Sequence, residues 1–174
     1  MSDIIKYYQT IPELGIKGRM NTPEEFDLIG LPKNLTGKNV LDIGCNMGAF
    51  LFESIARNAN AIIGVEPNND WRWLAWGILS ETDYKEFEIF RNLNEVPNYH
   101  YDLVLLLSVT HLDEVDNPQA IVDKAWELTA EGGLLIVEIN DRLQRKEVKL
   151  PNGKKLFGKN KDNRSVYHCI KNNA

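Results

Sequence analysis

The stretch that decides the fold is Val40-Leu41-Asp42-Ile43-Gly44-Cys45-Asn46-Met47-Gly48-Ala49-Phe50. Its first four residues are a short apolar run typical of a central parallel strand, and helix formers follow from Ala49. Between them, Gly44 and Gly48 lack a Cβ, so φ can be positive and a ligand can approach the backbone. Asn46 is the non-glycine residue that best tolerates left-handed geometry. The turn, which includes Cys45, therefore predicts a nucleotide-cofactor loop.

Two acids indicate which ligand the loop holds. Asp42 stands at the carboxyl end of its strand, facing the crevice where open α/β sheets bind ligands. A dinucleotide-binding fold carries G-x-G-x-x-G with its acid only after the second strand, whereas here a carboxylate also precedes the first glycine. Ala61–Glu66 is predicted to be the next strand, and its last residue, Glu66, could take both hydroxyls of a ribose. Asp42 can accept hydrogen bonds from a cationic ligand.

These residues resemble the class I S-adenosylmethionine-dependent methyltransferases, whose first motif runs D-x-G-x-G-x-G and whose second strand ends in an acid. Asn46 replaces the middle glycine of that motif. The leader, from Tyr8-Gln9-Thr10-Ile11 to Leu35-Thr36-Gly37-Lys38, also resembles the methyltransferases related to those that finish the wobble-uridine side chain of tRNA. The resemblance implies S-adenosyl-L-methionine as cofactor and methyl transfer as the reaction, with the loop residues Asp42, Gly44, Cys45, Asn46, Gly48, Glu66 and Pro67 around the cofactor.

Segments of strand and helix alternate along the chain, which predicts a Rossmann-like, doubly wound parallel sheet with helices on both faces. The predicted helices follow Thr22, with a capping box to Glu25, then cover residues 70–80 and about 118–130, with a short one at about 141–146. The further strands are expected at Phe87–Phe90, Tyr101–Leu107 and Leu134–Ile139. Antiparallel strands near the Asn152-Gly153 turn and over 165–170 are expected to close the sheet edge.

The helix over residues 70–80 has one apolar face, formed by Trp71, Leu74, Ala75, Ile78 and Leu79. Trp73 and Trp76 lie off this face. We interpret them as helix–sheet packing rather than as a platform for base stacking.

Further site residues follow the later strands. The resemblance places Asn92 and Leu93 at the adenine, while Ser108 and Val109 follow the fourth strand at the same rim. His111 is the titratable residue placed to act as a general base if the nucleophile must lose a proton, and a packing role is the alternative. The leader residues Tyr8 and Arg19 are the candidate substrate contacts. No metal-ligand spacing is present.

Length and composition favour one domain over residues 1–174, with a leader over 1–37 and a basic hairpin over 142–174. Cys45 and Cys169 have no evident partner and are expected to be apolar fillers in a reducing cytosol. No signal sequence and no apolar run of about 20 residues is present, so a cytoplasmic protein is expected.

Charge is unevenly distributed, although the net charge is only −5. Residues 142–174 hold 10 Lys and Arg but only the acids Glu147 and Asp162, a net charge of +8. This tail is interpreted as solvated surface or as a binding site for a phosphate-bearing partner such as tRNA. The acceptor, a small molecule or a tRNA, cannot be identified from the sequence.

Three functions stay open at this stage. The first is a methyltransferase acting on an O or N nucleophile. The second is the same fold using adenosylmethionine, or a modified form of it, for another transfer. The third is a catalytically silent cofactor-binding module.

Overall fold

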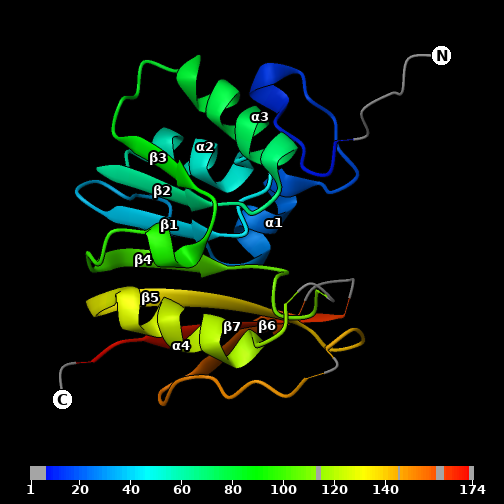
Figure 1. Ribbon diagram of the computed structural model, residues 1–174, viewed down its shortest axis with the longest axis vertical. Coiled ribbons are helices and arrows are strands. Elements are labelled where there is room, and N and C mark those ends of the chain that lie inside the picture. The colour runs from blue at the N-terminus through cyan, green and yellow to red at the C-terminus, as the bar shows by residue number, and fades with distance from the viewer. Residues whose placement is uncertain (1–6, 113–114, 145, 160–162, 173–174) are drawn as a thin grey trace.

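The structure is a computed structural model that describes residues 7–112, 115–144, 146–159 and 163–172. Its centre is a seven-stranded sheet with the order β3-β2-β1-β4-β5-β7-β6 (Figure 1). β1, β2, β3, β4 and β5 pair in parallel, and β7 runs antiparallel to both β5 and β6. The predicted Rossmann-like class, with antiparallel strands at one edge, is confirmed. The strands are β1 (Asn39–Ile43), β2 (Ala61–Val65), β3 (Phe87–Phe90), β4 (Tyr101–Leu106), β5 (Thr129–Asn140), β6 (Lys155–Lys159) and β7 (Arg164–Ile170).

The chain order reverses between β1 and β4. From β1 the sheet grows through β2 and β3 on one side and through β4 and β5 on the other. The carboxyl ends of β1 and β4 therefore open a crevice at this switch point, the usual place for a ligand in an open α/β sheet.

Helices cover the sheet on both faces. On one face, α1 (Thr22–Leu28), α2 (Ala49–Ala56) and α3 (Asn69–Ser80) bury Phe26, Phe50 and Leu79 against the strands. On the other face, α4 (Pro118–Leu128) buries Val122, Ala125 and Leu128 (Figure 1). Two short 3₁₀ helices, η1 (Pro12–Leu14) and η2 (Leu93–Glu95), lie in the connections. Among the described residues, none of the helices has the length and apolar character to cross a membrane.

The start of α1 differs from the prediction. Its N-cap is Asn21, and Thr22 is the first helical residue, so the predicted capping box from Thr22 to Glu25 is wrong. The hydroxyl of Thr22 instead accepts a hydrogen bond from the backbone N–H of Thr10 at 2.9 Å. This bond fastens the leader to α1, a long-range use that a local pattern does not reveal.

The junction between α4 and β5 also lies earlier than expected. The helix ends at Leu128 rather than near residue 130, because Thr129 already pairs with Tyr101 of β4. β5 then runs through Gly132 and Gly133, whose backbones exchange hydrogen bonds with Lys171 beyond β7. Sheet pairing on both sides thus extends the strand through two glycines that were expected to precede it.

Two C-terminal expectations need correction. Residues 141–143 form a turn rather than the predicted short helix, because the Asn140 side chain accepts the backbone N–H groups of Arg142 and Leu143. The segment before the Asn152-Gly153 turn is not a strand, since Lys149 exchanges hydrogen bonds with the side chain of Gln119 on α4. Arg145, within the predicted short helix, lies outside the described residues, as do Lys161 and Asp162 just before β7.

The tryptophans of α3 are placed differently from the interpretation above. The apolar face is confirmed, with Ala75, Ile78 and Leu79 buried. Trp73 and Trp76, however, are 68% and 51% exposed and contact each other edge to face rather than the sheet. They extend from the helix face opposite to the core, so the packing interpretation is wrong.

Candidate active site

The loop between β1 and α2 forms the floor of the crevice. Gly44, Asn46 and Gly48 all have positive φ, at 84°, 52° and 85°. The backbone N–H groups of Gly44 and Cys45 both donate to the carbonyl of Val65, which holds the loop against the end of β2. A Cβ on Gly44 would lie 2.4 Å from Cγ2 of Val109, so the close approach of β1 and the β4 loop requires glycine here.

Glu66, directly after β2, lies in the crevice with 8% of its surface exposed. One carboxylate oxygen accepts the backbone N–H of Asn46 at 2.9 Å and the other accepts that of Asn68 at 2.8 Å. Burial raises the pKa of Glu66, although these two hydrogen bonds and Arg72 act in the opposite direction. Each oxygen keeps a lone pair for a second donor, so the carboxylate can hold two neighbouring hydroxyls.

Asp42 lies beneath the loop and is 2% exposed. Burial, and next the charge of Glu66, raise its pKa from 3.8 to about 7. Its Oδ2 has no hydrogen-bond partner among the described residues, and neither has Oδ1 of Asn46. Buried acceptors without donors are costly. A cationic ligand with N–H donors would satisfy Asn46, which lines the cavity, while Asp42 beneath the loop would offset its charge.

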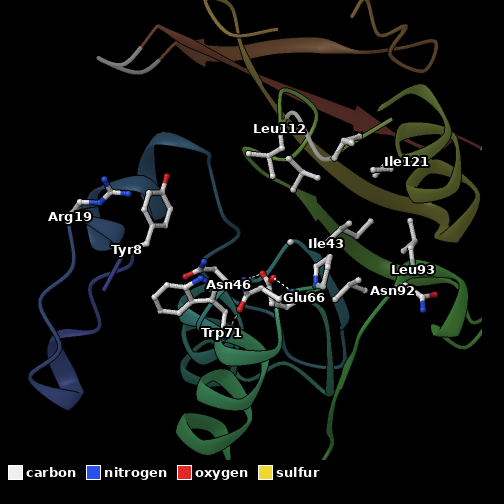
Figure 2. Close-up of a pocket in the computed structure, with 16 residues that line it drawn as sticks. Tyr8, Arg19, Ile43, Asn46, Glu66, Trp71, Asn92, Leu93, Leu112 and Ile121 are labelled. Carbon is white, nitrogen blue, oxygen red and sulfur yellow. Dashed lines mark hydrogen bonds between the residues drawn. The ribbon is translucent and has the colours of Figure 1, made fainter. Parts of the chain in front are cut away.

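A cavity of about 700 Å³ opens above the loop. Figure 2 shows Tyr8 and Arg19 at one end, Asn92 and Leu93 at the other, and Asn46 and Glu66 between them. The predicted site residues that line it are Tyr8, Arg19, Gly44, Asn46, Glu66, Pro67, Asn92, Leu93 and Val109. The lining residues that the sequence did not single out are Ile43, Val65, Asn68, Trp71, Leu112, Val115 and Ile121.

Three loop residues predicted to bind the cofactor do not line the cavity. Asp42 lies beneath the wall and Cys45 is fully buried. A Cβ on Gly48 would lie 3.3 Å from Cβ of Ala75 on α3, so Gly48 faces this helix. Burial, together with Asp42 and Glu66, raises the pKa of the Cys45 thiol well above its usual range. Cys45 is thus a buried filler, and Gly48 supplies the left-handed N-cap of α2.

Asn92 and Leu93 form the end of the cavity predicted to hold the adenine. The Asn92 side-chain oxygen caps η2 by accepting the backbone N–H of Asn94 at 3.1 Å. Its Nδ2 donates to Glu95 at 2.5 Å. Both ends of the amide are therefore already engaged, which leaves the second lone pair of its oxygen for an exocyclic amine.

Ser108 and His111, in the loop after β4, do not line the cavity among the described residues. Ser108 has a φ of 58° and directs its hydroxyl to Glu138 of β5. His111 is partly buried, and its Nδ1 is buried without a hydrogen-bond partner among the described residues. Burial, followed by the charge of Arg164, lowers the pKa of His111 against an opposing effect of Glu138. The imidazole is therefore neutral at pH 7 and can accept a proton.

The basic C-terminal residues are less free than their number suggests. Lys146 donates to the carbonyls of Val115 and Asp116, and Lys159 pairs with Asp141 at 2.7 Å. Arg145 and Lys161 lie outside the described residues. The exposed basic side chains for which the structure shows neither an ion pair nor a side-chain hydrogen bond within its described ranges are Arg142, Lys149, Lys154 and Lys155.

The fold and the crevice are those of an α/β protein that binds a nucleotide-type cofactor, and comparison with known proteins specifies the family. A family model described as a methyltransferase domain matches residues 24–166, so the chain belongs to this methyltransferase family. The family recognised from the sequence is confirmed. A ubiquinone biosynthesis O-methyltransferase from Psychrobacter cryohalolentis is 30% identical over 120 residues, which cover 62% of this chain and 43% of that protein. A tRNA U34 carboxymethyltransferase from a Sulfurovum species is 26% identical over 132 residues, 74% of this chain and 42% of that protein.

The chain thus spans less than half the length of these two curated relatives. Among solved structures, WbdD superposes with a TM-score of 0.73 at 20% identity, covering 98% of this chain and 46% of that one. Magnesium protoporphyrin IX methyltransferase from Synechocystis PCC 6803, solved with bound S-adenosylmethionine, gives a TM-score of 0.65 at 13% identity, covering 86% and 77%. These likenesses establish the fold, and the family supports S-adenosyl-L-methionine as the cofactor.

Proposed function

We propose that this protein is an S-adenosylmethionine-dependent methyltransferase acting on an oxygen or nitrogen nucleophile, and that residues 1–174 act as one domain. The observation that carries the proposal is Glu66, whose two oxygens are aimed into the cavity by backbone donors while each keeps a free lone pair. The unpartnered oxygen of Asn46 beside it and the buried carboxyl of Asp42 beneath the loop complete the surroundings for a cationic nucleoside. If the protein binds the cofactor but shows no turnover, the alternative is a catalytically silent cofactor-binding module.

Different residues of the cavity would hold different parts of the cofactor. Asn92 and Leu93 would hold the adenine, Glu66 the ribose, and the loop from Gly44 to Gly48 the amino acid end, with Asp42 compensating its charge from below. Tyr8 and Arg19, at the opposite end of the cavity, would contact the acceptor (Figure 2). When bound, S-adenosylmethionine supplies a methyl group already activated by the positive charge on its sulfur.

The protein's own contribution is then mainly positioning. A rigid floor of left-handed loop residues and an apolar wall of Val109, Leu112 and Ile121 exclude water and orient two reactants. Such orientation can supply roughly 7–11 kcal/mol of a barrier. Where the nucleophile carries a proton, His111 is the proposed base, because its lowered pKa keeps it neutral at pH 7.

For the acceptor we place a small molecule before tRNA. Among the ten Lys and Arg residues of 142–174, Lys146 and Lys159 bind groups within the chain, so the basic surface is thinner than the sequence suggests. The curated relatives include a ubiquinone biosynthesis O-methyltransferase and a tRNA U34 carboxymethyltransferase, so they do not favour either acceptor. The preference for a small molecule therefore rests on the reduced basic surface. We also propose a cytoplasmic location, because Cys45 and Cys169 are buried free thiols, the state kept in reducing compartments.

The decisive experiment measures S-adenosylhomocysteine by reversed-phase chromatography after incubation with adenosylmethionine and cell extract. Calorimetry with adenosylmethionine runs beside it, with Glu66→Gln as the variant that keeps the size of the side chain. We expect binding and product formation in the wild type, both reduced in the variant. Binding without product in any extract would favour the silent module, and absence of binding would overturn the proposal.

A further inference from the structure

A buried ion pair lies beside the active-site crevice. Arg164, the first residue of β7, donates through Nη1 to Oε1 of Glu138 on β5 at 3.0 Å. The side chain of Glu138 is 4% exposed and that of Arg164 is 16% exposed. Replacing such a pair by packed apolar residues often leaves a protein equally stable, because desolvation offsets the attraction. Stability alone therefore does not explain the pair.

The pair fixes the loop after β4 through Ser108. The Ser108 hydroxyl donates to the same Glu138 oxygen at 2.5 Å and accepts a hydrogen bond from Arg164. Ser108 has a φ of 58°, a conformation that a serine holds only when its surroundings impose it. The next residue, Val109, lines the cavity and is in the position that makes glycine obligatory at residue 44. One wall of the cavity therefore depends on the Glu138–Arg164 pair.

Arg164 also reaches the opposite wall. Burial lowers the pKa of Arg164, but the charge of Glu138 and the nearby Tyr8 hydroxyl raise it by more. Tyr8 belongs to the leader, lines the other end of the cavity, and lies under the guanidinium of Arg19 at 5.6 Å. The guanidinium from the C-terminal strand thus donates a hydrogen bond to Ser108 of the β4 loop and lies near Tyr8 of the leader.

We propose that Arg164, oriented by Glu138, is a positioning residue that joins the two walls of the cavity, Tyr8 of the leader and the loop beginning at Ser108. Arg164 itself does not line the cavity among the described residues, so it acts through these partners. The cavity keeps its shape because one side chain sets the distance between segments 100 residues apart in the chain. Its effect on cofactor affinity rests on the proposed function, whereas its effect on the two walls does not.

The test compares wild type, Arg164→Lys and Ser108→Gly, with Asp141→Asn as matched control. Lysine keeps the charge but lacks the guanidinium fork, and glycine accepts the left-handed φ while removing the hydroxyl. Asp141 also joins β5 to the C-terminal strands, through Lys159 and Ser165, yet it contacts neither wall. Amide hydrogen exchange is followed at residues 7–20 and 107–112 in the protein without ligand, and the dissociation constant of S-adenosylhomocysteine is measured by calorimetry.

We expect Arg164→Lys to speed exchange in both segments by about tenfold and Ser108→Gly to do so in the β4 loop, with the control close to wild type. The affinity for S-adenosylhomocysteine should fall about tenfold in Arg164→Lys. Unchanged exchange in both segments, or an equal rise in the control, would overturn the proposal that Arg164 joins the two walls. If the wild type binds no cofactor, the proposed function fails, but the exchange result still decides whether Arg164 joins the two walls.

A second readout separates a specific pair from general loosening. Glu138→Gln removes the negative charge that raises the pKa of His111, so this pKa, followed by NMR of the ring protons, should fall below the wild-type value. Loosening would instead expose His111 and raise its pKa towards the ordinary value of 6.5. A fall supports the proposal that Arg164 joins the two walls and a rise contradicts it. Because Arg164→Lys could impair folding, Ser108→Gly and Glu138→Gln keep the question decidable.

Discussion

Glu66 accepts the backbone N–H of Asn46 at 2.9 Å, so the acid at the end of β2 braces the loop that follows β1. The relation places the carboxylate in the cavity before any ligand arrives. It also makes the loop and the proposed ribose site one structural unit, since a change in Glu66 alters both.

The first prediction therefore concerns Glu66→Gln. The amide keeps one acceptor oxygen, so it can serve Asn46 or Asn68 but loses the charge that strengthens a bond to a ribose hydroxyl. A charged hydrogen bond is worth roughly 1.5–3 kcal/mol, so we expect adenosylmethionine to bind about 10- to 100-fold more weakly by calorimetry. Glu88→Gln, an exposed acid on β3, is the control. Equal affinities in wild type and Glu66→Gln would remove the ribose assignment.

A second prediction compares two glycines. In Gly44→Ala the new Cβ would lie 2.4 Å from Val109 at a φ of 84°, so we expect a loss of about 1–3 kcal/mol in the free energy of unfolding and impaired cofactor binding. Gly77→Ala adds a Cβ to α3 with nothing within 4 Å and should stabilise the protein by up to about 1 kcal/mol. Thermal unfolding of both variants checks this, and a neutral Gly44→Ala would contradict the close approach.

The third prediction follows from Asp42, whose pKa is raised from 3.8 to about 7 by burial and by Glu66. The folded state then binds a proton that the unfolded state has lost, so stability falls as pH rises between about 4 and 7, by up to about 4 kcal/mol. Asp42→Asn should remove this part of the pH dependence. The measurement is denaturant unfolding of wild type and variant, without ligand, across that range. Parallel stability curves would show that Asp42 is ionised throughout.

The same residue makes a prediction for binding. A cationic cofactor stabilises the ionised Asp42, so adenosylmethionine affinity should rise with pH up to about 7, by as much as about tenfold per unit. S-adenosylhomocysteine carries the same α-ammonium at its amino acid end, so its affinity should show a similar dependence on pH. Calorimetry in buffers of different ionisation enthalpy should detect proton release on binding adenosylmethionine, and an absence of proton release near pH 6 would contradict the charge compensation.

A fourth prediction concerns His111 as the base. His111→Ala should lower turnover by about 10²-fold or more and leave cofactor affinity unchanged, because the interaction is made mainly in the transition state. Since burial lowers the pKa of His111 below 6.5, turnover of the wild type should rise through a pH below 6.5 and be level at pH 7. Turnover within about threefold of wild type in the variant would return His111 to a packing role.

The last prediction tests tRNA against a small acceptor. If Arg142, Lys149, Lys154 and Lys155 contact phosphates, filter binding of total tRNA between about 50 and 200 mM salt should give a slope near −3 to −4 for log K against log salt. Lys154→Glu with Lys155→Glu should lower the slope by about two units. Weak binding that is insensitive to salt would exclude tRNA as the acceptor and support the small-molecule acceptor that we place first.

The floor of the site was predictable from sequence because its residues are set by local geometry. A glycine turn between a strand and a helix places Gly44 and Asn46, and the parallel sheet brings Glu66 beside them. The same holds for α3, where the apolar repeat gave the buried face. Trp73 and Trp76 were misjudged, because the repeat identifies the buried face but not how a large side chain off that face is accommodated.

The upper walls of the site were not predictable in the same way. Leu112, Val115 and Ile121 line the cavity through the path of the chain between β4 and α4, for which the sequence carries no repeat. Ser108 was predicted at the rim, but its left-handed φ and its bond to Glu138 direct it away from the cavity. Such contacts join residues 30 or more positions apart, so no local pattern records them.

Trp71 gives the cavity an optical property. Of the four tryptophans it alone lines the cavity, while Trp73 and Trp76 on the same helix face outward. Filling the space beside its indole replaces water by a nucleoside, which should change the emission of this one ring against a constant background from the others. The protein therefore carries its own fluorescent indicator of occupancy, and candidate acceptors can be screened by light before any product is known.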